Sequence, residues 1–111
     1  MSKVYKIRWT STAKEDLLHI VAYIKEGSPS IARAVYQQIK SKANSSNFFP
    51  LRGRIVPELQ KEGISMYREL ISSPWRIMYK VDSSTVYIMA IFDSRQNVEE
   101  LLLQKILEIQ R

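Results

Sequence analysis

Alternating apolar and polar residues predict β-strands over residues 3–9 and 75–81, and segments rich in strand-forming residues predict two more, over residues 66–71 and 85–92. The strand over residues 75–81 has one apolar side, and its opposite side carries the cations Arg76 and Lys80. The last of the four segments is apolar on both sides, which is typical of a central strand with both faces covered. Because short turns separate the three later strands, we expect an antiparallel meander with one core face and one cationic face.

Helical spacing of apolar residues predicts three helices, over about residues 11–26, over about residues 29–45 and from Asn97 onward. Thr12, with a glutamate three residues later, forms a capping-box pattern at the first helix. Ser28 is the candidate N-cap of the second helix, and Asn97 is that of the third. The first two helices are joined so briefly that they should pack as an antiparallel hairpin.

Two prolines and two glycines in residues 48–63 interrupt both the helical and the strand spacing of apolar residues. We therefore expect a loop there that carries Arg52 and Arg54. The element order is then β-α-α-β-β-β-α. This order predicts a single α+β domain over residues 1–111, with the helical hairpin packed on a small antiparallel sheet. The patterns leave open whether the first strand joins the sheet at an edge or pairs with the last strand.

Composition narrows the class of protein. The sequence has no cysteine, no apolar run long enough to span a membrane and no secretory signal pattern, so we expect a soluble cytoplasmic protein. The formal net charge is +6 and the sequence pI is about 9.7. This charge suits a nucleic-acid backbone, an acidic protein or an anionic membrane surface as the partner, and does not choose among them.

The sequence lacks the common catalytic and metal-binding motifs. It has no phosphate-binding glycine loop, no serine-hydrolase motif and no cluster of histidines and cysteines, so we expect no cofactor and no metal. His19 is the only histidine, and helical spacing places it on the polar side of the first helix. Ordinary histidine-based catalysis is therefore not expected, which leaves tyrosine, lysine, arginine or carboxylate chemistry.

Cations are the informative feature of the later half of the chain. The candidate target-binding set is Arg52, Arg54, Arg68, Arg76, Lys80 and Arg95. Arginine offers a planar fork of donors to a phosphate or a carboxylate, so such a cluster suits an anionic partner. The alternative is that Arg68 and Arg95 pair with Glu69 and Asp93 as structural salt bridges. We expect Arg76 and Arg95 to point to the same open rim of the sheet and to matter more for activity than for folding.

Several short motifs occur in order along the chain. They are G-R-I-V-P-E-L at 53–59, Y-R-E-L at 67–70, W-R-I-M-Y-K-V at 75–81 and V-Y-I-M-A-I-F-D-S-R-Q-N at 86–97, together with Ala13, Asp16 and Leu17 in the first helix. In these motifs the chain resembles the RelE/ParE superfamily of toxins from type II toxin–antitoxin systems. The resemblance spans nearly the whole chain and keeps the predicted element order. It implies a RelE/ParE-like toxin fold and a small prokaryotic toxin that a cognate antitoxin holds inactive.

The resemblance implies two kinds of activity. RelE-like toxins cleave messenger RNA on the ribosome with a cluster of lysines and arginines and a tyrosine near the C-terminus, whereas ParE-like toxins inhibit DNA gyrase without a recognised catalytic residue. Arg76 matches the RelE-like arginine that contacts the reacting phosphate, and Arg95 falls near the second one. However, the RelE-like lysines are not matched: Glu69 stands where the strand before that of Arg76 would carry a basic residue, and the C-terminal helix has no tyrosine. The G-R-I-V-P-E-L and Y-R-E-L patterns resemble ParE-like and plasmid-stabilisation members more closely.

We therefore expect a ParE-like toxin that inhibits DNA gyrase, leaning away from an enzyme. The alternatives are a RelE-like ribosome-dependent mRNA endonuclease, in which Arg76 and Arg95 would be catalytic, and a non-toxic basic module that binds nucleic acid or protein. We expect the antitoxin to bind the sheet and the helical hairpin and to form a hetero-oligomer with the toxin. The candidate antitoxin contacts are the apolar residues Leu17, Val21, Ile24, Val35 and Ile39.

Overall fold

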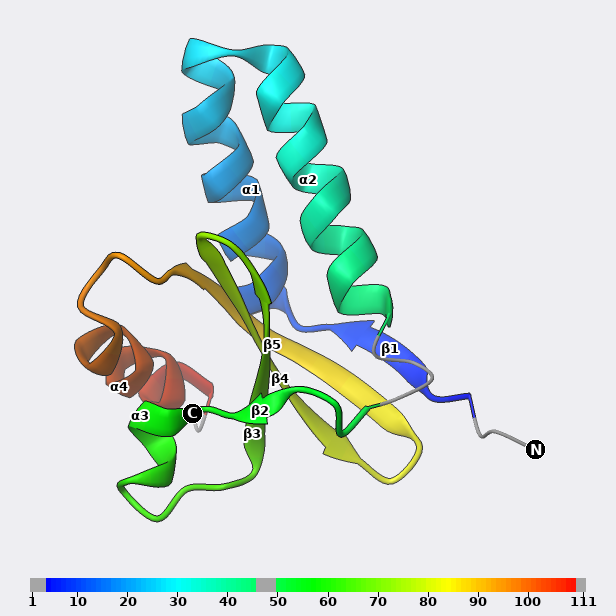
Figure 1. Cartoon of the computed structure of the whole chain (residues 1–111), viewed down its shortest axis with the longest axis vertical. Helices are drawn as coiled ribbons and strands as arrows, with labels where there is room; N and C mark the ends of the chain where they lie inside the picture. The colour runs from blue at the N-terminus through cyan, green and yellow to red at the C-terminus, as the bar shows by residue number, and fades with distance from the viewer. Residues whose placement is uncertain (1–3, 46–49, 110–111) are drawn as a thin grey trace.

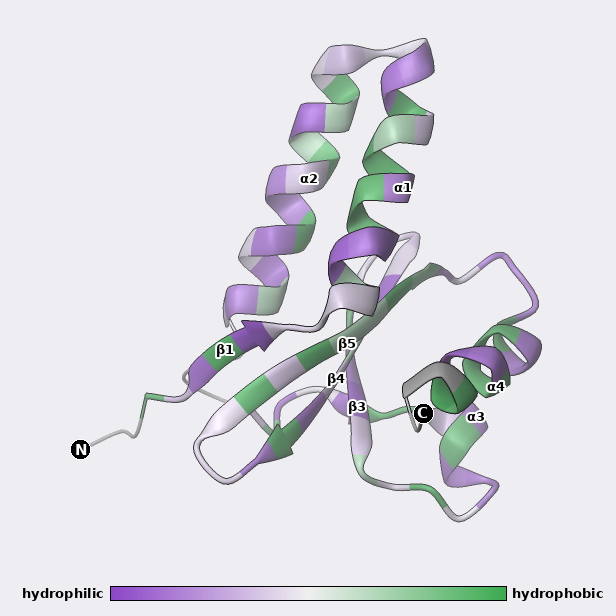
Figure 2. Ribbon diagram, turned by 180° about the vertical axis from the view of Figure 1, so that it is seen from behind, coloured by the Kyte–Doolittle hydropathy of each residue, from purple (hydrophilic) through white to green (hydrophobic). Residues whose placement is uncertain are grey.

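The computed structural model describes residues 4–45 and 50–109, with side chains up to residue 107 at the C-terminal end. It confirms the α+β fold: a helical hairpin covers one face of a five-stranded sheet, and two further helices lie against the other face (Figure 1). The ribbon of β5 is hydrophobic over much of its length, whereas α2 is mostly hydrophilic (Figure 2). No described helix combines the length and the hydrophobicity that a membrane crossing requires.

The strands lie in the order β1-β5-β4-β3-β2. Their bounds are Lys6–Trp9 for β1, Arg54–Ile55 for β2, Tyr67–Ser72 for β3, Trp75–Asp82 for β4 and Thr85–Asp93 for β5. The meander of β3, β4 and β5 is confirmed, with antiparallel pairing throughout. β1 pairs with β5 in parallel, which answers the question that the sequence leaves open. Residue 3, the expected start of the first strand, lies outside the described residues.

The two helices of the hairpin, α1 (Ser11–Gly27) and α2 (Pro29–Asn44), pack side by side as expected (Figure 1). Ser28 caps α2 by accepting the Ile31 N–H at 3.3 Å, as predicted. The cap of α1 is Thr10 rather than Thr12, because the Thr10 hydroxyl accepts the Ala13 N–H and also donates to the Ile88 carbonyl of β5. The start of the hairpin is thereby fixed to β5, an interior strand of the sheet.

The segment predicted as a loop over residues 48–63 is partly ordered, which corrects that prediction. It contains the short strand β2 and a one-turn helix, α3 (Pro57–Gln60), which begins with a proline at its first turn. Residues 48 and 49 of the predicted loop lie outside the described residues. The last helix, α4 (Val98–Ile109), begins as predicted, since the Asn97 side chain accepts the Glu100 N–H at 3.4 Å.

The sheet carries a core on each face. On the hairpin face, buried side chains of β4 and β5 pack with Ala13, Leu17, Ile39 and Ala43. On the opposite face, Met78 of β4 is fully buried among side chains of α3 and α4. The expectation of an open cationic face on β4 is therefore wrong, because α3 and α4 cover the region around Arg76. The register skips Met89 between the pairs Tyr79–Ile88 and Met78–Ala90, which places a β-bulge in β5.

Candidate functional site

The structure divides the six candidate cations among separate places. Arg54 and Arg76 belong to a partly buried group with Glu58 and Glu69, which we call the ion cluster. The other four lie outside it: Arg52 beside Ser45, Arg68 beside Gly53, Lys80 beside Tyr87, and Arg95 after β5. The predicted set is thus not one continuous surface.

Arg76 is the centre of the ion cluster. Its Nε donates to Glu69 Oε1 at 2.7 Å, and its two terminal nitrogens donate to the Glu58 carboxylate at 2.8 and 2.7 Å. The guanidinium carbon lies 5.2 Å from the centre of the Phe92 ring. Only 6% of the Arg76 side chain is exposed, so its donors are directed at partners within the protein.

Strand register explains why Glu69 reaches two arginines. Glu69 lies opposite Arg54 of β2, and its diagonal neighbour on β4 is Arg76, which pairs with Ile71. The second carboxylate oxygen of Glu69 accepts the Arg54 Nε–H at 2.6 Å. The Glu69 side chain has no exposed surface, and burial of a carboxylate is tolerated when such donors satisfy it.

The charges in the ion cluster balance, since two arginines face two glutamates. The hydrogen bonds from Arg76 hold the pKa of the Glu58 carboxyl below its usual value, against the opposing effect of burial. The same bonds, led by those to Glu58, raise the pKa of Arg76. A phosphate at Arg76 would have to displace a carboxylate that already makes charged hydrogen bonds there, so the ion cluster does not present a free anion site.

Arg76 and Arg95 do not share an open rim, which corrects that expectation. Arg76 is buried, whereas the Arg95 side chain is 71% exposed and follows the end of β5. Arg95 pairs with Asp93, two residues earlier, through contacts of 2.6 to 3.1 Å. The alternative of internal salt bridges is met for Arg95, which pairs with Asp93. Arg68 instead donates to the Leu51 and Gly53 carbonyls, and Glu69 pairs with Arg76 and Arg54.

Residues 50–53 are held against the sheet by Tyr79. Its buried hydroxyl donates to the Pro50 carbonyl at 2.6 Å and accepts the Gly53 N–H at 3.0 Å. Burial raises the pKa of Tyr79. A Cβ at Gly53 would lie 2.5 Å from the Tyr79 hydroxyl oxygen and 2.6 Å from the Glu69 carbonyl oxygen, so this approach requires glycine. Arg68 adds a hydrogen bond of 2.8 Å to the Gly53 carbonyl.

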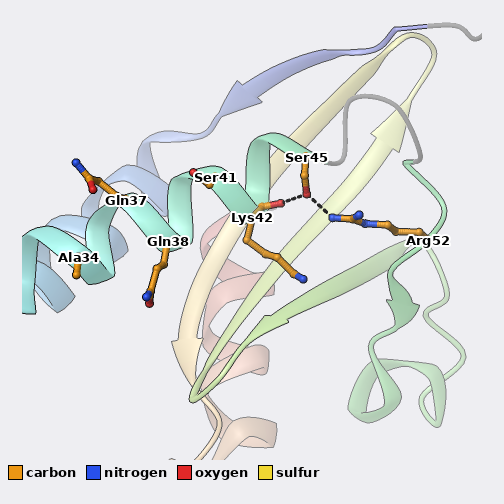
Figure 3. A pocket seen from close by; sticks show the side chains of 7 residues that line it. All are labelled: Ala34, Gln37, Gln38, Ser41, Lys42, Ser45 and Arg52. Carbon is orange, nitrogen blue, oxygen red and sulfur yellow. Dashed lines mark hydrogen bonds between the residues drawn. The ribbon is translucent and has the colours of Figure 1, made fainter.

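Arg52 lies beside the C-terminal end of α2, in an open hollow that Figure 3 shows. Its guanidinium donates to the Ser45 hydroxyl, which in turn donates to the Lys42 carbonyl at 2.6 Å. The other side chains around the hollow are mainly polar: Gln37, Gln38 and Ser41, with Ala34. Arg52 is therefore exposed next to Lys42, on a different part of the surface from the ion cluster.

The proposed antitoxin contacts differ in accessibility. Leu17 and Ile39 are 4% and 0% exposed and lie in the core beneath the hairpin, so they are unavailable to a partner of the folded chain. Val21, Ile24 and Val35 are half-buried. The sequence patterns do not single out the exposed apolar side chains of the hairpin, which are Leu18, Tyr23 and Ile31. These three residues lie outside the apolar stripe by which the sequence predicts each helix. The packing of the two helices is needed to show that their side chains face outward.

Glu58 is a further residue of the site that the sequence patterns do not identify. A proline followed by an acidic residue is a helix-start signal, and here Pro57 and Glu58 begin α3. This signal points to α3, but not to the pairing of Glu58 with Arg76. His19 is exposed, as expected. Within residues 4–45 and 50–109, no three His, Cys, Asp or Glu side chains come together as metal ligands.

A family model described as the ParE toxin of the type II toxin-antitoxin system, parDE, matches residues 7–98. No curated protein matches the chain at a significant level. Solved structures do match it, among them the chromosomal ParDE toxin–antitoxin system from P. aeruginosa. That match has a TM-score of 0.68 at 21% identity and covers 83% of this chain and 98% of that chain.

Two other solved structures share the fold. The toxin–antitoxin complex RelBE2 from Mycobacterium tuberculosis matches with a TM-score of 0.55 at 24% identity, over 81% of this chain and 91% of that chain. A mutant of E. coli toxin RelE in the free state matches with a TM-score of 0.58 at 18% identity, over 96% of this chain and 98% of that chain. Because the sequence identities to all three solved structures are below 25%, these matches show a shared fold only.

Proposed function

Because the chain belongs to the ParE toxin family of type II toxin–antitoxin systems, we propose that it inhibits DNA gyrase and is neutralised by a cognate antitoxin. We prefer gyrase to messenger RNA as the target because Arg76 already donates its hydrogen bonds to Glu58 and Glu69. An arginine that binds the reacting phosphate must present free donors to it, and the donors of Arg76 point to internal carboxylates instead. The proposed target places the activity in the cytoplasm.

A second observation supports the same choice. Arg95, the other arginine that a RelE-like nuclease would use, pairs with Asp93 and lies apart from the ion cluster. The C-terminal segment has no tyrosine to transfer a proton. Cleavage of RNA requires groups that hold the phosphate and move protons in one place, and these residues are not arranged in that way.

The cations that remain exposed are the proposed contacts with the target. Arg52, Arg54 and Arg95 keep exposed side chains, and Arg68 on β3 and Lys80 on β4 are half-exposed. With a net charge of +6, the chain should approach an acidic or DNA-bound partner faster than a neutral protein would. Arg76 is not itself a proposed contact: it binds Glu69, the carboxylate that also holds Arg54.

Antitoxin binding is proposed for the outward side of the helical hairpin. Val21, Ile24 and Val35 remain candidate contacts, and the exposed Leu18, Tyr23 and Ile31 extend the apolar surface that they offer. The two P. aeruginosa and M. tuberculosis structures that share the fold are a toxin–antitoxin system and a toxin–antitoxin complex by description. We expect this toxin likewise to form a hetero-oligomer with the product of the adjacent gene.

Two assays on the purified chain separate the proposed function from RNA cleavage. Plasmid supercoiling by gyrase should stop at a toxin concentration that leaves messenger RNA intact on translating ribosomes. Cleavage of the message codon by codon, with gyrase unaffected, would instead make the chain a RelE-like endonuclease. Induced expression without an antitoxin should arrest growth with signs of DNA damage, and harmless expression would favour a non-toxic binding module.

A further inference from the structure

Residues 27–57 carry positive charge without any negative charge. This part of the sequence has no aspartate or glutamate, whereas α1 carries Glu15, Asp16 and Glu26. Its cations are Arg33, Lys40, Lys42, Arg52 and Arg54. They account for most of the formal net charge of +6, because the charges in the rest of the chain nearly balance. An excess of charge confined to one helix and the segment after it predicts a surface for a polyanion.

The outward side of α2 ends in the open hollow of Figure 3, which has a volume of about 560 Å³. Gln37, Gln38 and Ser41 follow one another at helical spacing along it, and Lys42 and Arg52 lie at its end. The side chains of Gln38 and Lys42 extend on the same side of the helix, as residues four apart do (Figure 3). Among the described residues that line the hollow, none is acidic or aromatic. The hollow therefore offers hydrogen-bond donors and positive charge, without a ring for stacking.

Lys42 and Arg52 are available to an anion. Within residues 4–45 and 50–109, neither forms an ion pair, whereas Arg76 and Arg95 each pair with a carboxylate. Arg52 donates to the neutral Ser45 hydroxyl, and a guanidinium has further donors for a phosphate. The C-terminal end of a helix carries about half a negative charge, which two whole positive charges outweigh. A phosphate can therefore approach this end of α2 without displacing a carboxylate.

Duplex DNA suits this surface better than single-stranded RNA does. Proteins bind single strands by stacking bases on aromatic rings, and no described residue around the hollow supplies a ring. Duplex backbones are instead bound by lysine and arginine together with glutamine and serine, which are the residue types present here. With 16 residues, α2 is about 24 Å long, so its side chains can follow several phosphates in succession. Such contacts do not read the base sequence.

We propose that the outward side of α2, together with Arg52, binds the phosphate backbone of duplex DNA. Lys42 and Arg52 contact phosphates, and Gln37, Gln38 and Ser41 donate to phosphate or sugar oxygens beside them. During inhibition this surface contacts the DNA that gyrase holds, a role that rests on the proposed function. The binding of DNA itself does not depend on that function, so it can be measured on the chain alone.

A matched pair of double variants tests the cations. Lys42→Gln with Arg52→Gln removes two charges at the hollow, and the control Lys14→Gln with Lys25→Gln removes two exposed charges from α1. Fluorescence anisotropy with a short duplex of mixed sequence should show binding weakened by about tenfold or more in the first variant and by less than about threefold in the control. The slope of log affinity against log salt concentration should decrease by about 2 in the first variant only. Equal losses would mean that net charge governs binding, and the surface would be wrong.

A second pair adds a carboxylate instead of removing a cation. Gln38→Glu places it in the hollow, and Gln104→Glu places it at an exposed position of α4. Both substitutions change the net charge equally on a helix surface, so both variants should keep the melting temperature of the unsubstituted chain. Duplex binding should weaken several-fold in Gln38→Glu alone, because the carboxylate repels phosphate and neutralises Lys42. A similar loss in Gln104→Glu would exclude the hollow as the site.

The class of partner is tested with other ligands. The unsubstituted chain should bind duplexes of unrelated sequence equally, and more tightly than single-stranded RNA with the same number of phosphates. Tighter binding of the RNA, or no binding of the duplex at low salt, would contradict the proposal. Binding to gyrase free of DNA that is lost with Lys42→Gln and Arg52→Gln would assign this surface to an acidic protein instead.

Failure of the proposed function gives a different result from failure of the surface. If the chain leaves gyrase active and the variant with Lys42→Gln and Arg52→Gln loses duplex binding, the DNA surface is correct and gyrase is not the target. If the chain inhibits gyrase and that variant binds duplex DNA as tightly as the unsubstituted chain, the function is correct and the surface is wrong.

Discussion

The two faces of the sheet are covered in contrasting ways. The hairpin face is closed by apolar side chains of α1 and α2, and the largely buried charge that α1 carries, Asp16, pairs with Lys105 of α4. The face beneath α3 and α4 also has an apolar core, but the fully buried Glu69 and the nearly buried Arg76 lie beside it. Alternation along a strand tells which residues share a face, and the covering elements decide whether a cation on that face is free or paired.

Among substitutions that test the difference between the two faces, replacement of Arg76 should reduce the free energy of unfolding most. Arg76→Ala leaves Glu69 buried with one partner fewer and frees Glu58 from α3, so the free energy of unfolding should fall by about 3 kcal/mol or more. Urea denaturation followed by circular dichroism measures the loss. A loss below about 0.5 kcal/mol would mean that the ion cluster does not hold this face together.

Gly53→Ala should have the next largest effect, because the added methyl would collide with the Tyr79 hydroxyl and the Glu69 backbone. We expect a loss of about 2 kcal/mol in the free energy of unfolding, as for other overpacked sites. Gly27→Ala is the control, since a Cβ there meets nothing within 4 Å and should be neutral or stabilising by less than about 1 kcal/mol. Similar melting temperatures of the two variants would contradict the close approach at Gly53.

Acid should weaken the α3 face through Glu58. Its pKa is lowered in the folded chain from the ordinary value of 4.5, chiefly by the hydrogen bonds from Arg76. The carboxylate therefore stabilises the fold above that value, and this stabilisation is lost as the pH falls through the lower pKa of the folded state. Between about pH 5 and about pH 3, the unfolding free energy should fall less in Glu58→Gln than in the unsubstituted chain. Parallel curves would show that Glu58 does not contribute.

Arg95→Ala should have the smallest effect on stability. The Arg95 side chain is largely exposed and its pair with Asp93 is local, so the melting temperature of the variant should match that of the unsubstituted chain. As a proposed target contact, Arg95 should instead affect gyrase inhibition. A variant that unfolds would make Arg95 a structural residue like Arg76, and the contrast between the two arginines would disappear.

The fold was largely predictable because apolar residues recur at helical spacing in its long helices and favour strands in its long strands. The stripes of α1 and α2 and the alternation of β3, β4 and β5 locate five elements within a few residues. The elements β2 and α3 are too short to show a period, so prolines and glycines dominate the pattern there. Pairing of β1 with β5 depends on a contact between the two ends of the chain, which local patterns do not contain.

The candidate site was less predictable than the fold. Alternation correctly places Arg76 on the side of β4 opposite Ile77, but burial on that side depends on α3. Glu69 stands out in the sequence as a carboxylate among cations, and its buried position between Arg54 and Arg76 gives the reason for it. Exposed residues such as Leu18 do not stand out from the apolar stripe beside them.

The most direct measurement is an NMR titration of the arginine side chains with a short single-stranded RNA. Arg76 makes internal charged hydrogen bonds, so we predict that its Nε–H signal stays in place at RNA concentrations that shift the exposed Arg52 and Arg95. A shift of the Arg76 signal that saturates with RNA would show that the carboxylates give way to phosphate. That result would contradict the structural role of Arg76 and favour the endonuclease.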